Sequence, residues 1–387
     1  MIAIGQVNKY WGRDRGGIEA VLHAEVCDLS RRGYRVGVLA CRPQGSAARA
    51  FPPGVAGREL PAPVVASMPV HLGFPRALAE LAAASDLLHF HLPFPLAEAA
   101  ALRLVKRGPW VATLHAEVVG HAGWMRWAQR RITERFLRRV DAIVVSSASS
   151  SQVATLRPHQ ARVRVIPFGF DLAPFLAAPA APGARRGRGE PPVVVFLGRL
   201  VAYKGVEVLL RAAQALPARI HIIGDGRERP RLERLARELG LGGRATFFGH
   251  LPDAELPARL RAADIFALPS CTQAETFGVA QVEAMATGLP VVNTALATGT
   301  DWVSAHGLTG LTVAPGDPVA LAAALRRLIE DRPFRLACGR RARQRARALF
   351  SLETRGPELA ALYGELLPGP QPRPQPGIAA PPRRMAS

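Results

Sequence analysis

Cysteine, long apolar runs and lysine are all scarce in this chain, and the first two shortages exclude classes of protein. The four cysteines lie far apart without a Cys-x-x-Cys pair, which argues against a cysteine-ligated zinc site and favours a reducing compartment. No uninterrupted apolar run reaches the roughly 18 residues that a membrane-spanning helix needs. The opening stretch MIAIGQV is uncharged and too short for a signal peptide, and it reads as a strand. We therefore expect a cytoplasmic protein.

Only Lys9, Lys106 and Lys204 are lysines, so the net charge of +20 comes almost wholly from arginine. A GC-rich genome explains the use of arginine in place of lysine, but it does not explain the excess over Asp and Glu. Such an excess indicates an anionic partner, which could be a nucleic acid, a membrane surface or a phosphorylated substrate. Nucleic acid is the weakest of the three, because the sequence has no helix-turn-helix, zinc finger or aromatic RNA-binding motif.

Short β-rich runs alternate with amphipathic stretches in two series, which begin near residues 1 and 191. This alternation predicts an α/β protein with parallel sheets covered by helices on both faces. The segment between the series is rich in Pro, Gly, Ala and Arg, as a linker is. We expect a Rossmann-like domain at 1–168, a linker at 169–190, a second such domain at 191–350, a helix at 351–367 that reaches back to the first domain, and a disordered Pro-rich tail at 368–387.

Two loops that follow predicted strands offer groups for an anion. Gly16 and Gly17 precede a helix, where backbone N–H groups and the helix dipole favour phosphate. Their loop matches neither GxGxxG nor GxxxxGK[ST], so dinucleotide-binding and ATPase functions lose support. Arg199 and Lys204 stand five residues apart after a strand and could hold a diphosphate from two sides. The alternative is a solvated surface pair, although a lysine is unusual in this chain.

Histidines end two strands of the first series. His115 and Glu117 could serve acid–base chemistry or bind a sugar hydroxyl, and the alternative is a structural role. His89 and His91 have a metal-like i, i+2 spacing, but no third ligand is implied. We therefore favour packing and hydrogen bonding at the floor of a ligand cleft over a metal site.

The stretch ETFGVAQVE places Glu275 and Glu283 eight residues apart. On one helix they would diverge by about 80° and roughly 12 Å. A helix that starts near Gly278 instead leaves Glu275 on a loop and Glu283 on the helix, so that both can face one ligand. The N–H groups of Phe277, Gly278 and Val279 would then meet a phosphate. The alternative is that Glu275 caps the helix and Glu283 is solvated.

The segment Trp124–Val140 carries six Arg against one Glu, and Trp124, Ala128, Ile132 and Phe136 recur at i, i+4 spacing. A basic amphipathic helix with Trp is typical of binding to an anionic membrane surface. The alternative is a helix packed on its apolar side with a basic, solvated face.

Together these stretches resemble a glycosyltransferase of the GT-B fold in the retaining family 4. The resemblance covers about residues 1–350 and is carried by GGIE, FLGRLVAYKG, ETFGVAQVE with EAMATGLPVV, and GLTGLTVAPGDP, in this order. The motifs LLHFHLPFP, FLGRLVAYKGVEVLL and TGTDWV narrow it to bacterial mannosyl- and rhamnosyltransferases of surface polysaccharide assembly.

The resemblance implies a role for each matching residue. Arg199 and Lys204 would hold the donor diphosphate together with Gly17, Glu275 would bind sugar hydroxyls and Glu283 the ribose. His115 resembles the family's histidine near the donor sugar, but the usual His-Ser-Asp is here His-Ala-Glu. The resemblance also implies front-face attack with the leaving phosphate as base, without a protein nucleophile. It implies no metal, and the sequence has no Asp-x-Asp motif.

We therefore expect a retaining enzyme, cytoplasmic or peripheral at the inner membrane face. It would move mannose or rhamnose from a GDP-sugar to a glycan or glycolipid of the cell surface, with no cofactor and no nucleic-acid partner. One alternative is a nucleotide-sugar epimerase of the same fold. Another is a non-catalytic scaffold tethered to membrane or nucleic acid by its charge.

Overall fold

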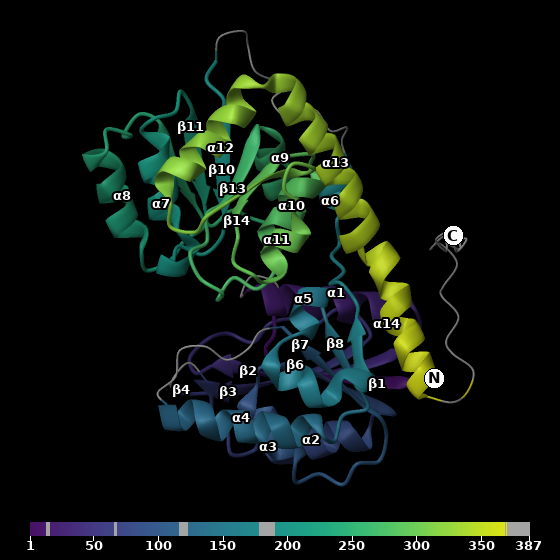
Figure 1. Cartoon of the computed structure of the whole chain (residues 1–387). Coiled ribbons are helices and arrows are strands. Elements are labelled where there is room, and N and C mark those ends of the chain that lie inside the picture. The colour runs from purple at the N-terminus through teal and green to yellow at the C-terminus, as the bar shows by residue number, and fades with distance from the viewer. Residues whose placement is uncertain (13–15, 66–67, 116–122, 178–189, 368, 370–387) are drawn as a thin grey trace. The chain divides into compact units, whose positions relative to one another are not determined.

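A computed structural model of the chain describes residues 1–12, 16–65, 68–115, 123–177, 190–367 and 369 (Figure 1). The chain divides into two compact units: Met1–Phe170 with Ser351–Ser387, and Asp171–Phe350. Most of the linker expected at 169–190 and of the tail expected at 368–387 lies outside the described residues. None of the helices in the described ranges combines the length and hydropathy that a bilayer crossing requires.

The first unit is built on a parallel sheet in the order β3-β2-β1-β6-β7-β8-β9. Buried residues, most of them apolar, fill its central strands, as expected where helices cover both faces. A short antiparallel pair, Val64–Val65 (β4) and Met68–Pro69 (β5), lies outside this sheet. The sheet strands are Ala3–Tyr10 (β1), Arg35–Pro43 (β2), Val55–Ala62 (β3), Leu87–Leu92 (β6), Trp110–Leu114 (β7), Ala142–Val145 (β8) and Val163–Val165 (β9).

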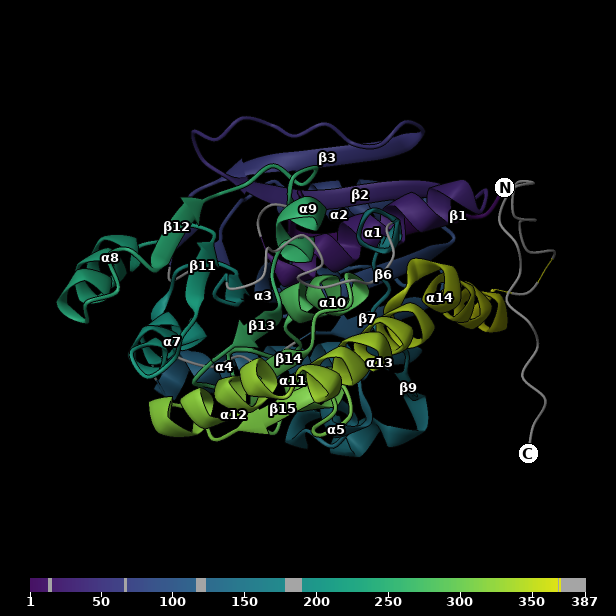
Figure 2. The same ribbon diagram turned by 90° about the horizontal axis from the view of Figure 1, so that it is seen from above.

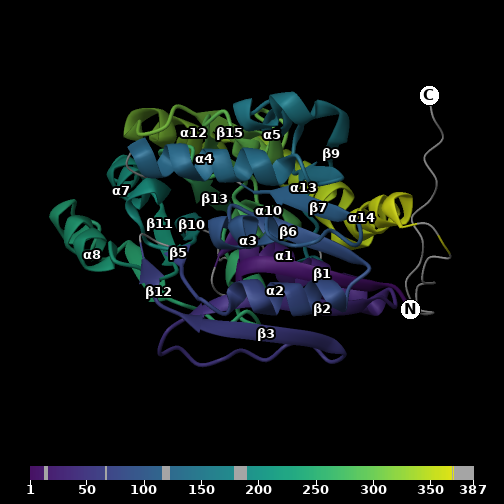
Figure 3. The ribbon, with the colours of Figure 1, turned by 90° about the horizontal axis from the view of Figure 1, so that it is seen from below.

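Two apolar cores cover the two faces of this sheet. One contains side chains of α2, α3 and α4, which lie side by side in Figure 3. The other contains side chains of α1 and of α14, so a helix from the end of the chain completes the first unit. The helices are Gly17–Arg31 (α1), Phe74–Ala83 (α2), Pro95–Ala101 (α3), Gly123–Leu137 (α4), Ala148–Ser151 (α5), Leu352–Leu366 (α14) and the 3₁₀ segment Ala154–Arg162 (η1).

The second unit has a parallel sheet in the order β12-β11-β10-β13-β14-β15. Helix α7 packs on α12 and α10 packs on α13, and Figure 2 shows α12 beside β15. The strands are Val193–Leu197 (β10), Arg219–Ile223 (β11), Ala245–Gly249 (β12), Ile265–Leu268 (β13), Val291–Thr294 (β14) and Gly310–Val313 (β15). The helices are Ala173–Leu176 (α6), Ala202–Lys204 (η2, 3₁₀), Val206–Ala213 (α7), Arg229–Glu238 (α8), Leu256–Arg261 (α9), Val279–Ala286 (α10), Gly299–Val303 (α11), Pro318–Glu330 (α12) and Arg332–Phe350 (α13).

The two parallel sheets confirm the α/β fold class that the alternation predicts. The basic helix is shorter than expected, because α4 ends at Leu137 and not at Val140. Arg139 lies just beyond that end. Its guanidinium donates to the carbonyls of Ala101, Leu102 and Leu104, so it closes the end of α3 and does not form part of a free basic face.

Candidate functional site

The loops after β10, β13 and β14 carry the candidate site of the second unit. These strands are neighbours in a parallel sheet, so their carboxyl ends meet at one edge, where ligands of such sheets bind. The loop after β10 brings Lys204, the loop after β13 brings Glu275, and β14 ends at Thr294. The topology thus gathers residues that are far apart in the sequence.

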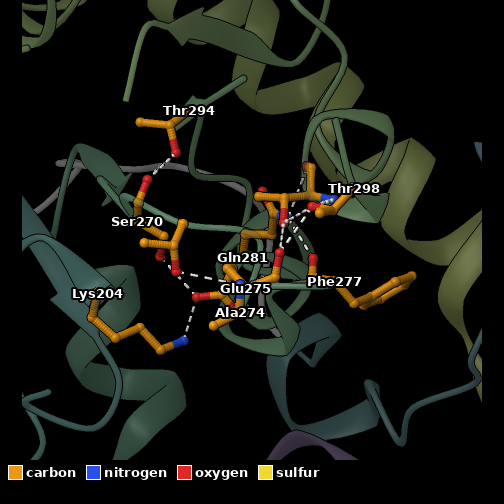
Figure 4. A network of polar contacts seen from close by, with 10 residues as sticks. Lys204, Ser270, Ala274, Glu275, Phe277, Gln281, Thr294 and Thr298 are labelled. Atoms are coloured by element: carbon orange, nitrogen blue, oxygen red, sulfur yellow. Dashed lines mark hydrogen bonds and ion pairs between the residues drawn. The ribbon is translucent and has the colours of Figure 1, made fainter. Parts of the chain in front are cut away.

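Lys204 and Glu275 form an ion pair, which Figure 4 shows from close by. The Nζ atom of Lys204 lies 2.5 Å from Oε2 of Glu275, and the same oxygen accepts a hydrogen bond of 2.8 Å from the Ser270 hydroxyl. The carbonyl of Ser270 in turn accepts a bond from the Thr294 hydroxyl. The sequence predicts Lys204 and Glu275 as site residues but does not predict that they touch.

Gly205 allows the lysine loop to approach the end of β13. Its φ of +67° lies in the left-handed region, and a Cβ atom there would stand 1.9 Å from the carbonyl oxygen of Pro269. A bond of 2.7 Å from the Cys271 N–H to the Tyr203 carbonyl fastens the two loops together. Only glycine therefore permits the approach that joins Lys204 to Glu275.

The backbone of Glu275 is held as firmly as its side chain. Its carbonyl accepts from the hydroxyls of Thr298, at 2.8 Å, and Thr300, at 3.1 Å. The side-chain amide of Gln281 donates to the carbonyls of Phe277 and Thr300. Sequence reasoning missed these supporting residues, although TGTDWV, which contains Thr298 and Thr300 at its start and third position, contributes to the family resemblance.

Helix α10 begins at Val279, which confirms the predicted start near Gly278. Gly278 has a φ of +74° and packs against Leu268, which explains glycine at this turn. Glu275 lies on the loop, and no side chain in the described part of the protein caps this helix, so the alternative of a capping Glu275 is wrong. Glu283 lies on the helix and is half-buried, while Phe277 is buried.

Arg199 and Lys204 differ in their surroundings. Arg199 is exposed, whereas only 12% of the Lys204 side chain is exposed. The alternative of a solvated pair is therefore wrong for Lys204. Both residues lie between β10 and α7, so this edge of the sheet carries an exposed guanidinium and a shielded ammonium that could serve an anionic ligand.

In the first unit, α1 begins at Gly17, directly after Gly16. The first-turn N–H groups of such a helix are suited to an anion.

Two residues that the sequence singles out have side chains that the structure does not describe. Glu117 lies outside the described residues, as does the side chain of Trp124.

His89, His91 and His115 form a buried stack with Phe168. Successive ring centroids are 4.7, 5.2 and 4.8 Å apart. Burial lowers the pKa of His91 to about 3 and holds the pKa values of His89 and His115 well below the ordinary histidine value, so the rings are neutral at pH 7. The hydrogen bonding predicted for His89 and His91 is confirmed, because both nitrogens of each ring have partners.

Glu25 supplies the third ligand that the sequence does not imply. A carboxylate oxygen of Glu25 and one nitrogen each of His89 and His91 lie within 4.8 Å of one another, which is close enough for a metal ion. However, those ring nitrogens already bond Tyr363 and Gln6. Burial and the neighbouring Asp28 raise the pKa of Glu25 to about 8, so it tends to be neutral at pH 7. A neutral acid and two occupied imidazoles do not favour a metal.

Both halves of the chain match known sequence families. Residues 15–174 match the family described as glycosyltransferase family 4, and residues 182–345 match the one described as glycosyl transferases group 1. The D-rhamnosyltransferase WbpZ of Pseudomonas aeruginosa is 32% identical over 277 residues, which cover 70% of this chain and 71% of that protein.

Two further relatives cover more of the chain. The D-inositol 3-phosphate glycosyltransferase of Corynebacterium jeikeium is 33% identical and covers 92% of this chain and 93% of its own length. The O-antigen chain mannosyltransferase C of Escherichia coli is 27% identical, with coverage of 92% and 96%.

Among solved structures, a sucrose-phosphate synthase of Thermosynechococcus elongatus has the same fold. Its TM-score is 0.76 at 23% identity, and the alignment covers 95% of this chain and 99% of that one.

Proposed function

Because the chain belongs to glycosyltransferase family 4 and is a retaining enzyme that takes its sugar from a nucleotide donor, we propose a specific donor and acceptor for it. The proposed donor is GDP-mannose or GDP-rhamnose. The proposed acceptor is a cell-surface glycan or glycolipid. The similarity to a D-rhamnosyltransferase supports rhamnose as the sugar. The similarity to an O-antigen chain mannosyltransferase supports mannose and a cell-surface glycan as acceptor. The family match favours transfer over the epimerase and scaffold alternatives.

The observation that carries the site is the Lys204–Glu275 pair at the carboxyl ends of β10 and β13. Lys204 and exposed Arg199 would neutralise the donor diphosphate and the charge that grows on it as the glycosidic bond breaks. Glu275, fixed by Ser270, would accept hydrogen bonds from sugar hydroxyls. The half-buried Glu283 would bind the ribose.

Backbone groups complete the proposed donor site. The start of α10, from Phe277 through Gly278 to Val279, directs the positive end of a helix at the same edge as Lys204. In the first unit, Gly16 and Gly17 at the start of α1 would meet the diphosphate, and His115 would meet the sugar. None of these roles requires a metal ion or a protein nucleophile.

For the acceptor, the support comes from helix α4, whose exposed residues suit an anionic membrane surface. A lipid-linked acceptor would be found at such a surface. Phe136 and Leu137 anchor α4 in the core, while Trp127 on the same helix is 62% exposed. The guanidinium of Arg131 lies 5.5 Å from the Trp127 ring centre, and Arg135 is also exposed. An indole next to exposed arginines suits the interface of an anionic bilayer.

A donor screen tests the proposed sugar. A ligand that binds only the folded protein raises its melting temperature by mass action. Among GDP-, UDP- and ADP-sugars at equal concentration, we expect GDP-mannose or GDP-rhamnose to raise it most and to be consumed in a transfer assay. A larger shift and faster turnover with a UDP-sugar would refute the proposed donor and leave the family assignment untouched.

A further inference from the structure

Six buried or nearly buried polar side chains of the first unit form one unbranched chain of hydrogen bonds. It runs from Thr113 to His89 (2.7 Å), Tyr363 (2.6 Å), Gln6 (3.3 Å), His91 (2.8 Å) and His115 (2.9 Å). Strands β1, β6 and β7 and helix α14 contribute members. Because every link connects to the next, the direction of one bond constrains its neighbours.

The three imidazoles make this constraint strict. Each ring is neutral, so it has one N–H donor and one lone pair. A ring that accepts at one nitrogen must therefore donate at the other. The Tyr363 hydroxyl is less restrictive, because it has a single proton to donate but an oxygen that can accept more than one bond. Gln6 is the one member of the network with separate donor and acceptor groups, so the orientation of its amide sets the direction toward His91 and His115 and makes Tyr363 an acceptor from Gln6.

The amide oxygen of Gln6 faces His91 and its nitrogen faces Tyr363. On the first side, Nε2–H of His91 donates to Oε1 of Gln6, which leaves Nδ1 of His91 as an acceptor. His115 must then donate from Nε2 to Nδ1 of His91. Its proton is therefore on Nε2, and its Nδ1 has a lone pair.

Glu25 favours the same direction. Its Oε2 is buried, has no hydrogen-bond partner in the described part of the chain, and lies 3.6 Å from Nε2 of His91. The distance from that oxygen to Nδ1 of His89 is longer, at 4.0 Å. In a neutral carboxyl with its proton on the other oxygen, Oε2 attracts an N–H more than a lone pair, so it stabilises the N–H on His91 rather than on His89.

We propose that Gln6 and His91 are positioning residues that hold His115 in the tautomer with Nε2 protonated, so that Nδ1 accepts a hydrogen bond from a sugar hydroxyl. His115 follows the last residue of β7 and is 6% exposed, and no group in the described ranges bonds its Nδ1. The assignment of the hydroxyl rests on the proposed function, whereas the tautomer rests on the hydrogen-bond chain alone.

Nitrogen NMR of the full chain labelled with ¹⁵N-histidine tests the tautomer directly, and the missing signals of His115→Gln identify His115. We expect the two-bond ¹H–¹⁵N pattern of a neutral ring protonated on Nε2. Gln6→Met should mix the tautomers, because it removes the amide and roughly keeps the length. Gln6→Glu should preserve the wild-type pattern, because it keeps an acceptor for His91.

Thr113→Val is the matched control. It removes the hydrogen bond between Thr113 and His89, which is the link farthest from His115. It should lower stability without changing the His115 tautomer. Protonation of His115 on Nδ1 in the wild type would overturn the proposal, even if Gln6→Met did not fold. An unchanged pattern in folded Gln6→Met would overturn it too. If the expected tautomer is found but its signals do not respond to the nucleotide sugar that gives the largest thermal shift in the donor screen, the hydrogen-bond network is supported and the proposed sugar contact is refuted.

Discussion

The ammonium of Lys204 lies 2.5 Å from a carboxylate oxygen of Glu275, and only 12% and 7% of these side chains are exposed. Sequence reasoning assigns the two residues to different parts of a donor, the diphosphate and the sugar. In the structure the two side chains are ion-paired with each other, so a change in either residue affects its partner.

Glu275→Ala should remove activity and also lower stability, because Lys204 would keep a shielded charge without its partner. Breaking a buried pair from one side costs roughly 3–5 kcal/mol. We expect product formation to fall at least about 100-fold, as on loss of a group that stabilises the transition state, and the urea midpoint to fall. Ser270→Ala, which removes one neutral donor to the same oxygen, should cost about 1 kcal/mol. Full activity of Glu275→Ala would refute the site.

Gly205→Ala should displace the lysine loop. The new Cβ would need the space of the Pro269 carbonyl oxygen, so we expect a loss of stability well above the roughly 1–2 kcal/mol of a left-handed residue alone. Gly240→Ala is the matched control, since Gly240 has a φ of +71° and open space around it. Urea unfolding and transfer assays should show that only the Gly205 variant loses activity. Equal effects would contradict the loop contact.

Glu25 should make stability fall as the pH rises. Its folded pKa of about 8 exceeds the model-compound value of 4.5, so the folded state keeps a proton that the unfolded state releases. This contribution is full below pH 4.5 and is lost as the pH rises through about 8, a change on the order of a few kcal/mol. Urea unfolding between pH 5 and 9 should show a flatter profile for Glu25→Gln than for the wild type. Exposed Glu255→Gln, with the same charge change, should follow the wild type.

Reversal of two charges on α4, Arg131→Glu with Arg135→Glu, should weaken flotation with anionic vesicles. Each basic residue near such a surface contributes about 1 kcal/mol. Arg234→Glu with Arg237→Glu on α8 carries the same charge change on another helix and should bind as the wild type does. Arg139→Ala should lower stability instead, because three carbonyls lose their donor. Wild-type protein that floats with neither anionic nor neutral vesicles would refute the membrane surface.

Local pattern predicts a large share of this architecture and a smaller share of the site. The apolar strands and the start of α10 at Val279 follow from burial and turn chemistry, which act over a few residues. Strand β3 is harder to predict, because half of its residues are exposed at the sheet edge and it lacks a continuous apolar run. The contact between Lys204 and Glu275 joins residues 71 apart, and the chain of hydrogen bonds joins Gln6 to Tyr363 across 357 residues. No local signal specifies such pairs, since topology brings them together.

Helix α14 has a consequence for the order in which the protein is made. The first unit needs Leu359, Leu362 and Tyr363 to cover one face of its sheet, yet these residues leave the ribosome after the whole of the second unit, Asp171–Phe350. A nascent chain usually folds from its N-terminus. Here the second unit can fold while the first still exposes an apolar face, and while His89 and Gln6 still lack their hydrogen-bond partner Tyr363. The domain synthesised first is the one that is completed last.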